Sequence, residues 1–198
     1  MKKVLGIALA VVAGLFLLCT FAFGGIYNKL VSADEAVKSA WSQVENVYQR
    51  RLDLIPNLVQ TVKGYAAHEK ETLEAVIEAR SKATQIQIHG DQLADPAALE
   101  QFQQAQGQLS SALGRLLVVA EQYPDLKANQ NFLALQTQLE GTENRITVER
   151  MRFNETAKSF NTMIRQFPEV WVANKMQLEK KAYFQAEQGA NQAPKVQF

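Results

Sequence analysis

The stretch RRLDLIPNLVQTVKGYAAHEKETLEAVIEAR, residues 50–80, lies in a seven-residue apolar repeat that runs from Val37 to Ala79. One heptad position holds Val37, Val44, Leu58, Tyr65 and Ala79, and the other holds Trp41, Tyr48, Ile55, Val62 and Val76. A repeat this long predicts a helix whose apolar seam packs along other helices. Pro56 interrupts it, because proline leaves the carbonyl four residues back, that of Leu52, without its helical donor.

A membrane-length apolar run precedes this repeat. Residues 4–26 are 23 consecutive residues without a charge, and at about 1.5 Å per residue such a helix spans the roughly 30 Å hydrocarbon core of a bilayer. We therefore expect residues 1–26 to be an N-terminal membrane anchor that contacts lipid through residues 4–26. A cleaved signal peptide is the alternative, although its apolar core is usually only ~7–15 residues long. A lipid-modified Cys19 is disfavoured by Leu18, which stands where a small residue is expected.

The lysines around the anchor predict its orientation. Lys2 and Lys3 precede the apolar run, whereas basic and acidic residues are mixed after it. Positive charge favours the cytoplasmic side of a membrane, so we expect a cytoplasmic N-terminus. The predicted location is the inner or plasma membrane, crossed once, with the soluble domain periplasmic or extracellular.

The rest of the chain has helical spacing broken by turn residues. One long helix or two stacked ones are expected from Tyr27 to about residue 88, with a bend near residues 53–56. Asp95 with Pro96 is a helix start signal. Pro124 lies in a tight turn, and Pro168 ends a third long helix. Because no strand pattern is present, we predict an all-α fold: an N-terminal transmembrane helix, then an antiparallel up-and-down bundle of three long helices plus a shorter C-terminal helix.

The predicted helices differ in length, and this difference predicts where the chain divides into a neck and a bundle. The first outruns the second, so residues 27–57 are expected to form a membrane-proximal neck and residues 58–182 the helical bundle, followed by a C-terminal tail, 183–198. On this view the neck residues Trp41, Val44 and Tyr48 have no obvious cover within their own chain. We expect them to contact other copies in a homo-oligomer or a membrane-protein partner.

A second stretch, residues 83–114, also favours association. It contains eight glutamines but only three acidic residues and no lysine or arginine. An exposed helix face usually carries more charge. This face is therefore expected either to lie against a neighbour through amide hydrogen bonds or to be a neutral solvated surface.

Motifs for catalysis, cofactors and metals are missing from the sequence. The 21 basic and 20 acidic residues balance, which argues against nucleic-acid binding. His68-Glu69 begins like a zinc-protease helix but lacks a second histidine four residues on, and the one cysteine is Cys19 in the apolar run. No phosphate-binding loop or serine elbow occurs. We expect no enzymatic activity, cofactor or metal.

Polar residues within the apolar seam leave two interpretations open. Arg51 and Glu69 must find partners if buried, either in ion pairs with Glu140, Glu143 or Arg152 of the third long helix or in a recognition site. The first interpretation predicts a membrane-anchored helical scaffold or interaction protein of the bacterial envelope, which self-associates and catalyses no reaction. The alternative is an envelope enzyme or ligand-binding accessory with a polar pocket between residues 50 and 69. Its candidate residues are Arg50, Arg51, Asp53, Asn57, His68 and Glu69.

Several blocks of the sequence resemble the LemA family of bacterial membrane proteins. They are RRLDLIPNLV at 50–59, VKGYAAHE at 62–69, EAR at 78–80, YPDLKA at 123–128, GTENRI at 141–146, FN at 153–154, FP at 167–168 and PKV at 194–196. The similarity covers essentially the whole soluble part, from Tyr27 to the C-terminus. It implies a helical bundle on a single membrane anchor, in a family without an established enzymatic activity, with similar proteins in magnetosome membranes.

Overall fold

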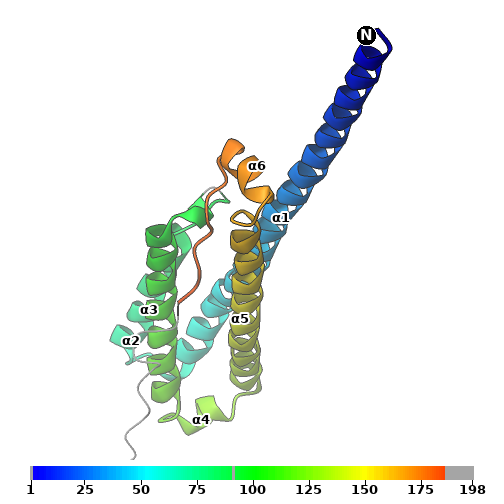
Figure 1. Cartoon of the computed structure of the whole chain (residues 1–198). Coiled ribbons are helices and arrows are strands. Elements are labelled where there is room, and N and C mark those ends of the chain that lie inside the picture. The colour runs from blue at the N-terminus through cyan, green and yellow to red at the C-terminus, as the bar shows by residue number, and fades with distance from the viewer. Residues whose placement is uncertain (1, 91, 186–198) are drawn as a thin grey trace, which may run out of the picture.

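The computed structural model of the chain describes residues 2–90 and 92–185 and is built of helices over these residues (Figure 1). They are α1 (Lys2–Tyr65), α2 (Lys70–Gln85), the 3-10 turn η1 (Gln92–Ala94), α3 (Pro96–Ala120), α4 (Pro124–Lys127), α5 (Gln130–Met163) and α6 (Glu169–Lys175). The predicted class is confirmed: a long N-terminal apolar helix leads into a bundle of long helices, and a short helix follows near the C-terminus.

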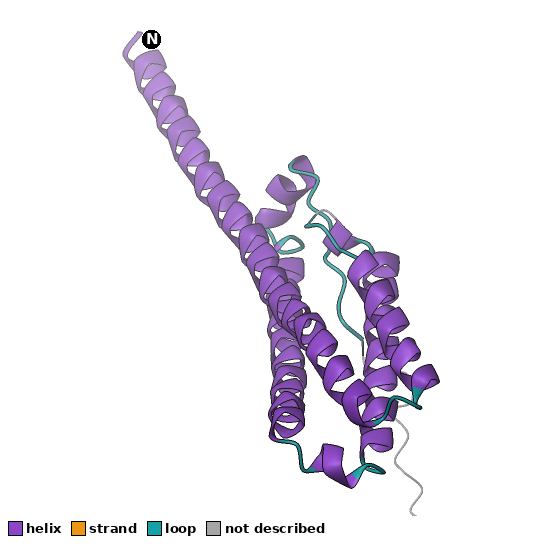
Figure 2. Ribbon diagram, turned by 180° about the vertical axis from the view of Figure 1, so that it is seen from behind, coloured by secondary structure: helices purple, strands orange, loops and turns teal. Residues whose placement is uncertain are grey.

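Helix α1 is one continuous helix that joins the apolar run to the bundle. Its N-terminal part projects from the rest of the molecule, as Figures 1 and 2 show. Large apolar side chains there are exposed, among them Leu15, Phe16, Leu18 and Phe21. From Leu30 onward the same helix carries buried residues at helical spacing. Within the described residues, α1 is the one helix long and apolar enough to cross a membrane.

The first helix ends earlier than the periodicity predicts. Residues 66–69 form a tight turn, in which Glu69 N donates to Ala66 O at 3.1 Å, and α2 then runs back and packs on α3. α5 is the main packing partner of the bundle part of α1. Four packed helices, α1, α2, α3 and α5, therefore form the bundle.

This reversal changes the surroundings of the predicted neck. Trp41, Val44 and Tyr48 are only 2%, 0% and 4% exposed. They belong to a core cluster that includes Phe102 of α3 and Phe153 of α5, and the Trp41 ring meets both phenyl rings edge to face. The expectation that these residues lack cover in their own chain is wrong, because it rested on a helix about 20 residues too long.

Side-chain caps begin the two long helices α3 and α5. Asp95 Oδ1 accepts a hydrogen bond of 2.9 Å from Ala97 N at the start of α3, with Pro96 at the first helical position, as predicted. Asn129 Oδ1 accepts one of 3.1 Å from Phe132 N at the start of α5. Such caps satisfy amide groups that the first helical turn leaves unpaired.

An extended segment, residues 178–185, follows α6 and returns along the bundle between α3 and α5 (Figure 1). Asn161 donates to Lys181 O and accepts from Lys181 N, both at 2.8 Å. Asn154 forms the same pair of bonds with Phe184, at 3.0 and 2.9 Å. Two asparagine amides on α5 thus bind this backbone as a neighbouring strand would. The last residues of the predicted tail, 186–198, lie outside the described residues.

Candidate functional site

The buried guanidinium of Arg51 lines a polar cavity in the bundle. Arg51 is on the seam of α1 and is 1% exposed. Its Nη1 donates to Glu143 Oε1 at 2.6 Å and to Ser110 Oγ at 2.9 Å, and Nη2 donates to the side-chain oxygen of Gln106. The predicted ion pair between Arg51 and the third long helix, now α5, is therefore confirmed with Glu143 as the acid.

A cleft of about 380 Å³ opens beside this arginine, between α1, α3, α5 and the end of the extended segment. Side chains of both charge signs and several amides face the cleft. Its lining consists of Tyr48, Arg51, Glu100, Gln103, Gln104, Gln106, Gly107, Ser110, Glu143, Ile146, Thr147, Arg150 and Gln185. Because the lining offers hydrogen-bond donors, acceptors and charges of both signs, the cleft can bind a polar group by hydrogen bonds and by charge.

The wall of the cleft includes a tyrosine that stays neutral. Burial raises the pKa of the Tyr48 phenol, and the nearby Arg150 and Arg51 oppose this only in part. The Arg51 guanidinium lies 5.1 Å from the centre of the Tyr48 ring. At neutral pH the phenol is therefore protonated and able to donate a hydrogen bond, and its ring also supports the buried cation.

The end of the extended segment lines the cleft through Gln185. Gln103 of α3 donates to Gln185 O at 3.0 Å and accepts from Gln185 N at 3.3 Å. Arg150 of α5 also donates to Gln185 O, at 3.0 Å, while its guanidinium lies 4.7 Å from the Phe184 ring centre. Residues from two helices therefore hold the segment where it meets the cleft.

The predicted polar pocket between residues 50 and 69 is not formed. Arg50, Asp53 and Asn57 are exposed on α1, with Asp53 accepting a bond from Gln49 at 2.7 Å, and His68 is exposed in the turn. Glu69 accepts 2.9 Å from the hydroxyl of Tyr123, close to the opposite end of the bundle from η1. Of the predicted pocket residues, the structure brings only Arg51 to the cleft.

Apart from Tyr48, an interaction candidate, and Glu143, a predicted ion-pair partner, the remaining cleft residues were not predicted as a site, although one signal pointed to them. Gln103, Gln104 and Gln106 come from the glutamine-rich stretch that was predicted to face a neighbour or solvent. Two of these amides do bind a neighbour, but the neighbour is in the same chain. Gln106 binds the Arg51 side chain, and Gln103 binds the backbone of Gln185. Groups of three or more potential metal ligands do not occur among the described residues.

The fold and the cleft define a class of protein: a helical bundle with an internal polar cleft, carried on an N-terminal apolar helix suited by length and composition to cross a membrane. The LemA family model matches residues 40–198, which is most of the chain. The chain belongs to the LemA family, as the sequence blocks predicted.

Named relatives agree with this assignment. The chain is 31% identical to protein LemA of Metamycoplasma hominis, over 84% of this chain and 72% of the relative. It is 30% identical to magnetosome protein MamQ of Magnetospirillum gryphiswaldense and 28% identical to magnetosome protein MamQ 2 of Paramagnetospirillum magneticum, over 80% of this chain in both cases. The aligned part spans 64% of each magnetosome relative, slightly less than two thirds of its length.

Proposed function

We propose that this chain is a membrane-anchored helical scaffold of the bacterial envelope that presents its cleft to partner proteins, a second copy of itself among them, without catalysing a reaction. One observation carries the proposal: the helix that exposes apolar side chains at its N-terminal part also forms the bundle core at its C-terminal part. Since no flexible linker separates the two parts, the bundle keeps a set distance and orientation relative to the anchor.

The anchor also sets the side on which the bundle acts. Lys2 and Lys3 before the apolar run favour a cytoplasmic N-terminus, which places the bundle in the periplasm or outside the cell. A cysteine introduced at exposed Ser159, in a Cys19→Ser background, tests this with a membrane-impermeant maleimide. Labelling in intact cells with a permeable outer membrane supports the orientation, and labelling only after lysis contradicts it.

The bonding within the cleft supports recognition more than chemistry. The Arg51 guanidinium is already engaged with Ser110, Glu143 and Gln106. A guanidinium stays protonated in proteins, so Arg51 can position polar groups but does not transfer protons. Exposed Gln104 and Glu100 at the rim, whose side chains bond each other at 3.2 Å, are available to an incoming protein surface.

The volume of the cleft favours a second candidate function, a ligand-binding accessory. About 380 Å³ falls in the ~300–1,000 Å³ range of small-molecule sites. Arg150 and Glu100 in the lining carry opposite charges, so a small zwitterion is the matching ligand class. A thermal shift produced by free amino acids, and lost in Arg150→Gln, would favour this function over the scaffold.

Photo-crosslinking from the rim tests the scaffold proposal. A photoreactive amino acid at Gln104 is compared with the same residue at Ser159, which is exposed on α5 outside the cleft. Two differently tagged copies of the full chain are expressed together, so that an adduct between copies is recognised by both tags. The proposal expects an adduct from position 104 and none from 159. Equal adducts, or no adduct from either position, contradict it.

A further inference from the structure

Helix α6 exposes a pair of aromatic side chains. Phe167, just before the helix, and Trp171 within it are 70% and 62% exposed, and their rings meet edge to face with centroids 5.0 Å apart. The other side of α6 is anchored in the core through Val172 and Ala173, which are 7% and 1% exposed. A rigidly held aromatic pair that faces solvent marks a contact surface, since water disfavours such apolar area.

An ion pair fixes the level of α6 along α1. Lys29 Nζ lies 2.8 Å from Glu169 Oε1, in the first turn of α6. Lys29 is three residues beyond Ile26, the last residue of the uncharged run, which is about 4.5 Å along a helix axis. α6 therefore lies beside the point where α1 leaves the predicted span.

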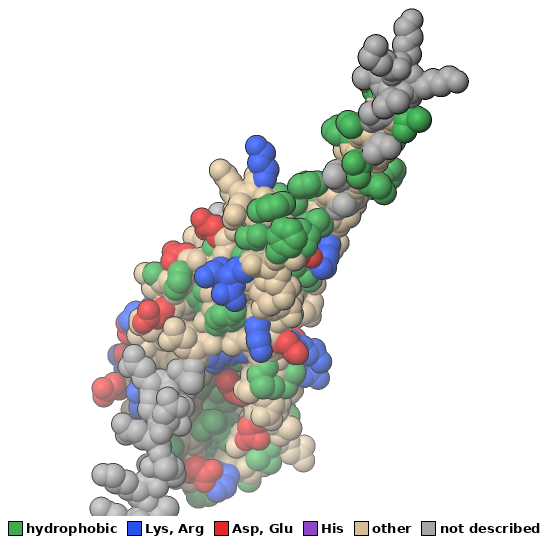
Figure 3. All heavy atoms as spheres, in the orientation of Figure 1, with side chains coloured by type: hydrophobic (Ala, Val, Ile, Leu, Met, Phe, Trp, Pro, Cys, Tyr) green, Lys and Arg blue, Asp and Glu red, His purple; other side chains and the backbone are tan. Residues whose placement is uncertain are grey.

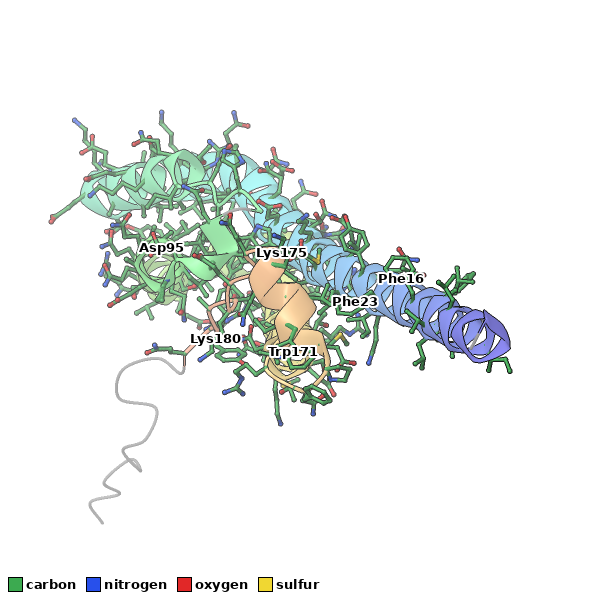
Figure 4. The ribbon with its side chains drawn as sticks, turned by 45° about the horizontal axis from the view of Figure 1, so that its top comes forward. Phe16, Phe23, Asp95, Trp171, Lys175 and Lys180 are labelled. Carbon is green, nitrogen blue, oxygen red and sulfur yellow. The ribbon has the colours of Figure 1, made fainter. Side chains whose placement is uncertain are left out.

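The figures show the same arrangement. In Figure 3 hydrophobic side chains gather at the end of the bundle where α1 departs. Figure 4 brings this end forward: α6, with Trp171 and Lys175 labelled, lies in front, beside the part of α1 that carries Phe23 and Phe16. The exposed apolar surface of α1 and the aromatic pair therefore lie at the same end of the molecule.

The chemistry around the pair matches the boundary between lipid and water. Tyr27 on α1 is half exposed at the same level. Aromatic side chains collect at this boundary because their rings prefer the headgroup region. Three basic residues close to the pair in sequence, Arg165, Lys175 and Lys180, are exposed and suited to anionic headgroups.

We propose that α6 is a second membrane contact, which inserts Phe167 and Trp171 into the interfacial layer of an anionic bilayer while Arg165, Lys175 and Lys180 bind lipid phosphates. This inference rests on the membrane anchoring proposed above. With two contact points, the anchor and α6, the bundle cannot swing about α1. The cleft is then presented at one angle to the membrane.

Tryptophan quenching by brominated lipids tests this contact in the full chain. The chain has two tryptophans, and Trp41 lies in the core, where lipid does not reach it. Vesicles contain phosphatidylcholine and phosphatidylglycerol, with bromine either near the headgroups or deep in the acyl chains. Trp171→Phe removes the reporting group, and Trp171→Phe with Val118→Trp moves it to another exposed site, on α3.

The proposal expects stronger quenching of the unmodified chain by the shallow bromines than by the deep ones. It also expects quenching to fall in pure phosphatidylcholine and to be lost in both variants. If all three proteins float with the vesicles but are quenched equally, the α6 contact is overturned while the anchor stands. If the unmodified chain does not float, both the anchor and the contact fail. If a photoreactive residue at Phe167 captures a second copy in place of lipid, α6 is a protein interface and the proposal is wrong.

Discussion

Arg80 Nε donates a hydrogen bond of 3.0 Å to the backbone carbonyl of Leu52, the carbonyl that Pro56 leaves without its helical donor. A side chain of α2 thus replaces the missing amide of α1, and α1 passes through Pro56 as one helix. The sequence block from 50 to 80 begins on α1 and ends at Arg80 on α2, the two helices that this hydrogen bond joins. The relationship gives a structural reason for a proline inside the longest helix of the chain.

Removing the Arg80 donor should destabilise the bundle, unless Pro56 is removed as well. Arg80→Met keeps the aliphatic stem but leaves the Leu52 carbonyl unpaired, which should lower the free energy of unfolding by about 1–3 kcal/mol. In a Pro56→Ala background, the backbone N–H restored at position 56 can donate to that carbonyl, so the same change should cost less than about 0.5 kcal/mol. Urea unfolding of the four proteins in detergent measures the coupling. Equal costs in both backgrounds would show that the bond does not compensate for the proline.

The ion pair in the cleft should be sensitive to loss of its acid. Glu143→Gln keeps the shape of the side chain but leaves the buried Arg51 charge with neutral acceptors only, and we expect a loss of about 1–3 kcal/mol, limited because Glu143 is 45% exposed. Glu140→Gln is the matched control, since Glu140 is exposed on the same helix, and it should change stability by less than about 0.5 kcal/mol. Replacing both partners, as Arg51→Met with Glu143→Met, should restore most of the loss. Similar costs for the two glutamine variants would argue against a stabilising pair.

The asparagines of α5 should determine whether the extended segment stays bound. Asn161→Asp retains an acceptor for Lys181 N but cannot donate to Lys181 O. Hydrogen exchange at the Lys181 amide should accelerate about tenfold, which corresponds to about 1.4 kcal/mol. Asn144→Asp, at an exposed position of the same helix, should leave that rate unchanged. If both variants exchange alike at residue 181, the segment is held by its buried side chains and not by the amide pairs.

The carboxylate of Asp34 should make the bundle less stable in acid. Burial works to raise the pKa of Asp34, but the ammonium groups of Lys181 and Lys38 outweigh it and hold the pKa below its ordinary value of 3.8. A carboxylate with a lowered pKa in the folded state contributes stability above 3.8, and this is lost as pH falls through the folded value. Stability should therefore fall less steeply below pH 3.8 in Asp34→Asn than in the unmodified chain. Carbon NMR titration should place the Asp34 midpoint below 3.8 and move it upward in Lys181→Met, and an unmoved midpoint would exclude Lys181 as a cause.

The periodicity was sufficient to predict that the chain is helical and where α3 begins, but not that α2 is a separate helix. Asp95 with Pro96 begins α3, and the proline at 124 begins α4, because these residues act through local backbone geometry. The turn at residues 66–69 was missed, since Ala66, Ala67 and His68 contain no helix breaker and the heptad spacing continues across it. What decides the turn is tertiary: α2 buries Leu73, Val76 and Ala79 by folding back onto its neighbours.

The candidate site was only partly predictable, for a related reason. Arg51 was recognised because a charge on an apolar seam needs a partner, and an acid on the third long helix was among the options. The glutamines and Ser110 of α3 are uncharged, so the sequence around them does not signal that they need a partner. Their role depends on which face of α3 meets Arg51 of α1, and that is set by the tertiary packing. The amide pairs on residues 178–185 likewise join groups 20 and 30 residues apart.

The central claim is that α1 anchors the bundle in a bilayer, and vesicle flotation of the full chain tests it most directly. We predict that the unmodified chain floats with vesicles after an alkaline carbonate wash. Leu15→Lys with Leu18→Lys should stay at the bottom of the gradient, because each lysine near the bilayer centre costs about 2.5–3.5 kcal/mol. The control pair Ile77→Lys with Val118→Lys, on exposed sites of the bundle, should float like the unmodified chain. An unmodified chain that fails to float, or a Leu15 and Leu18 variant that floats equally well, would contradict the account.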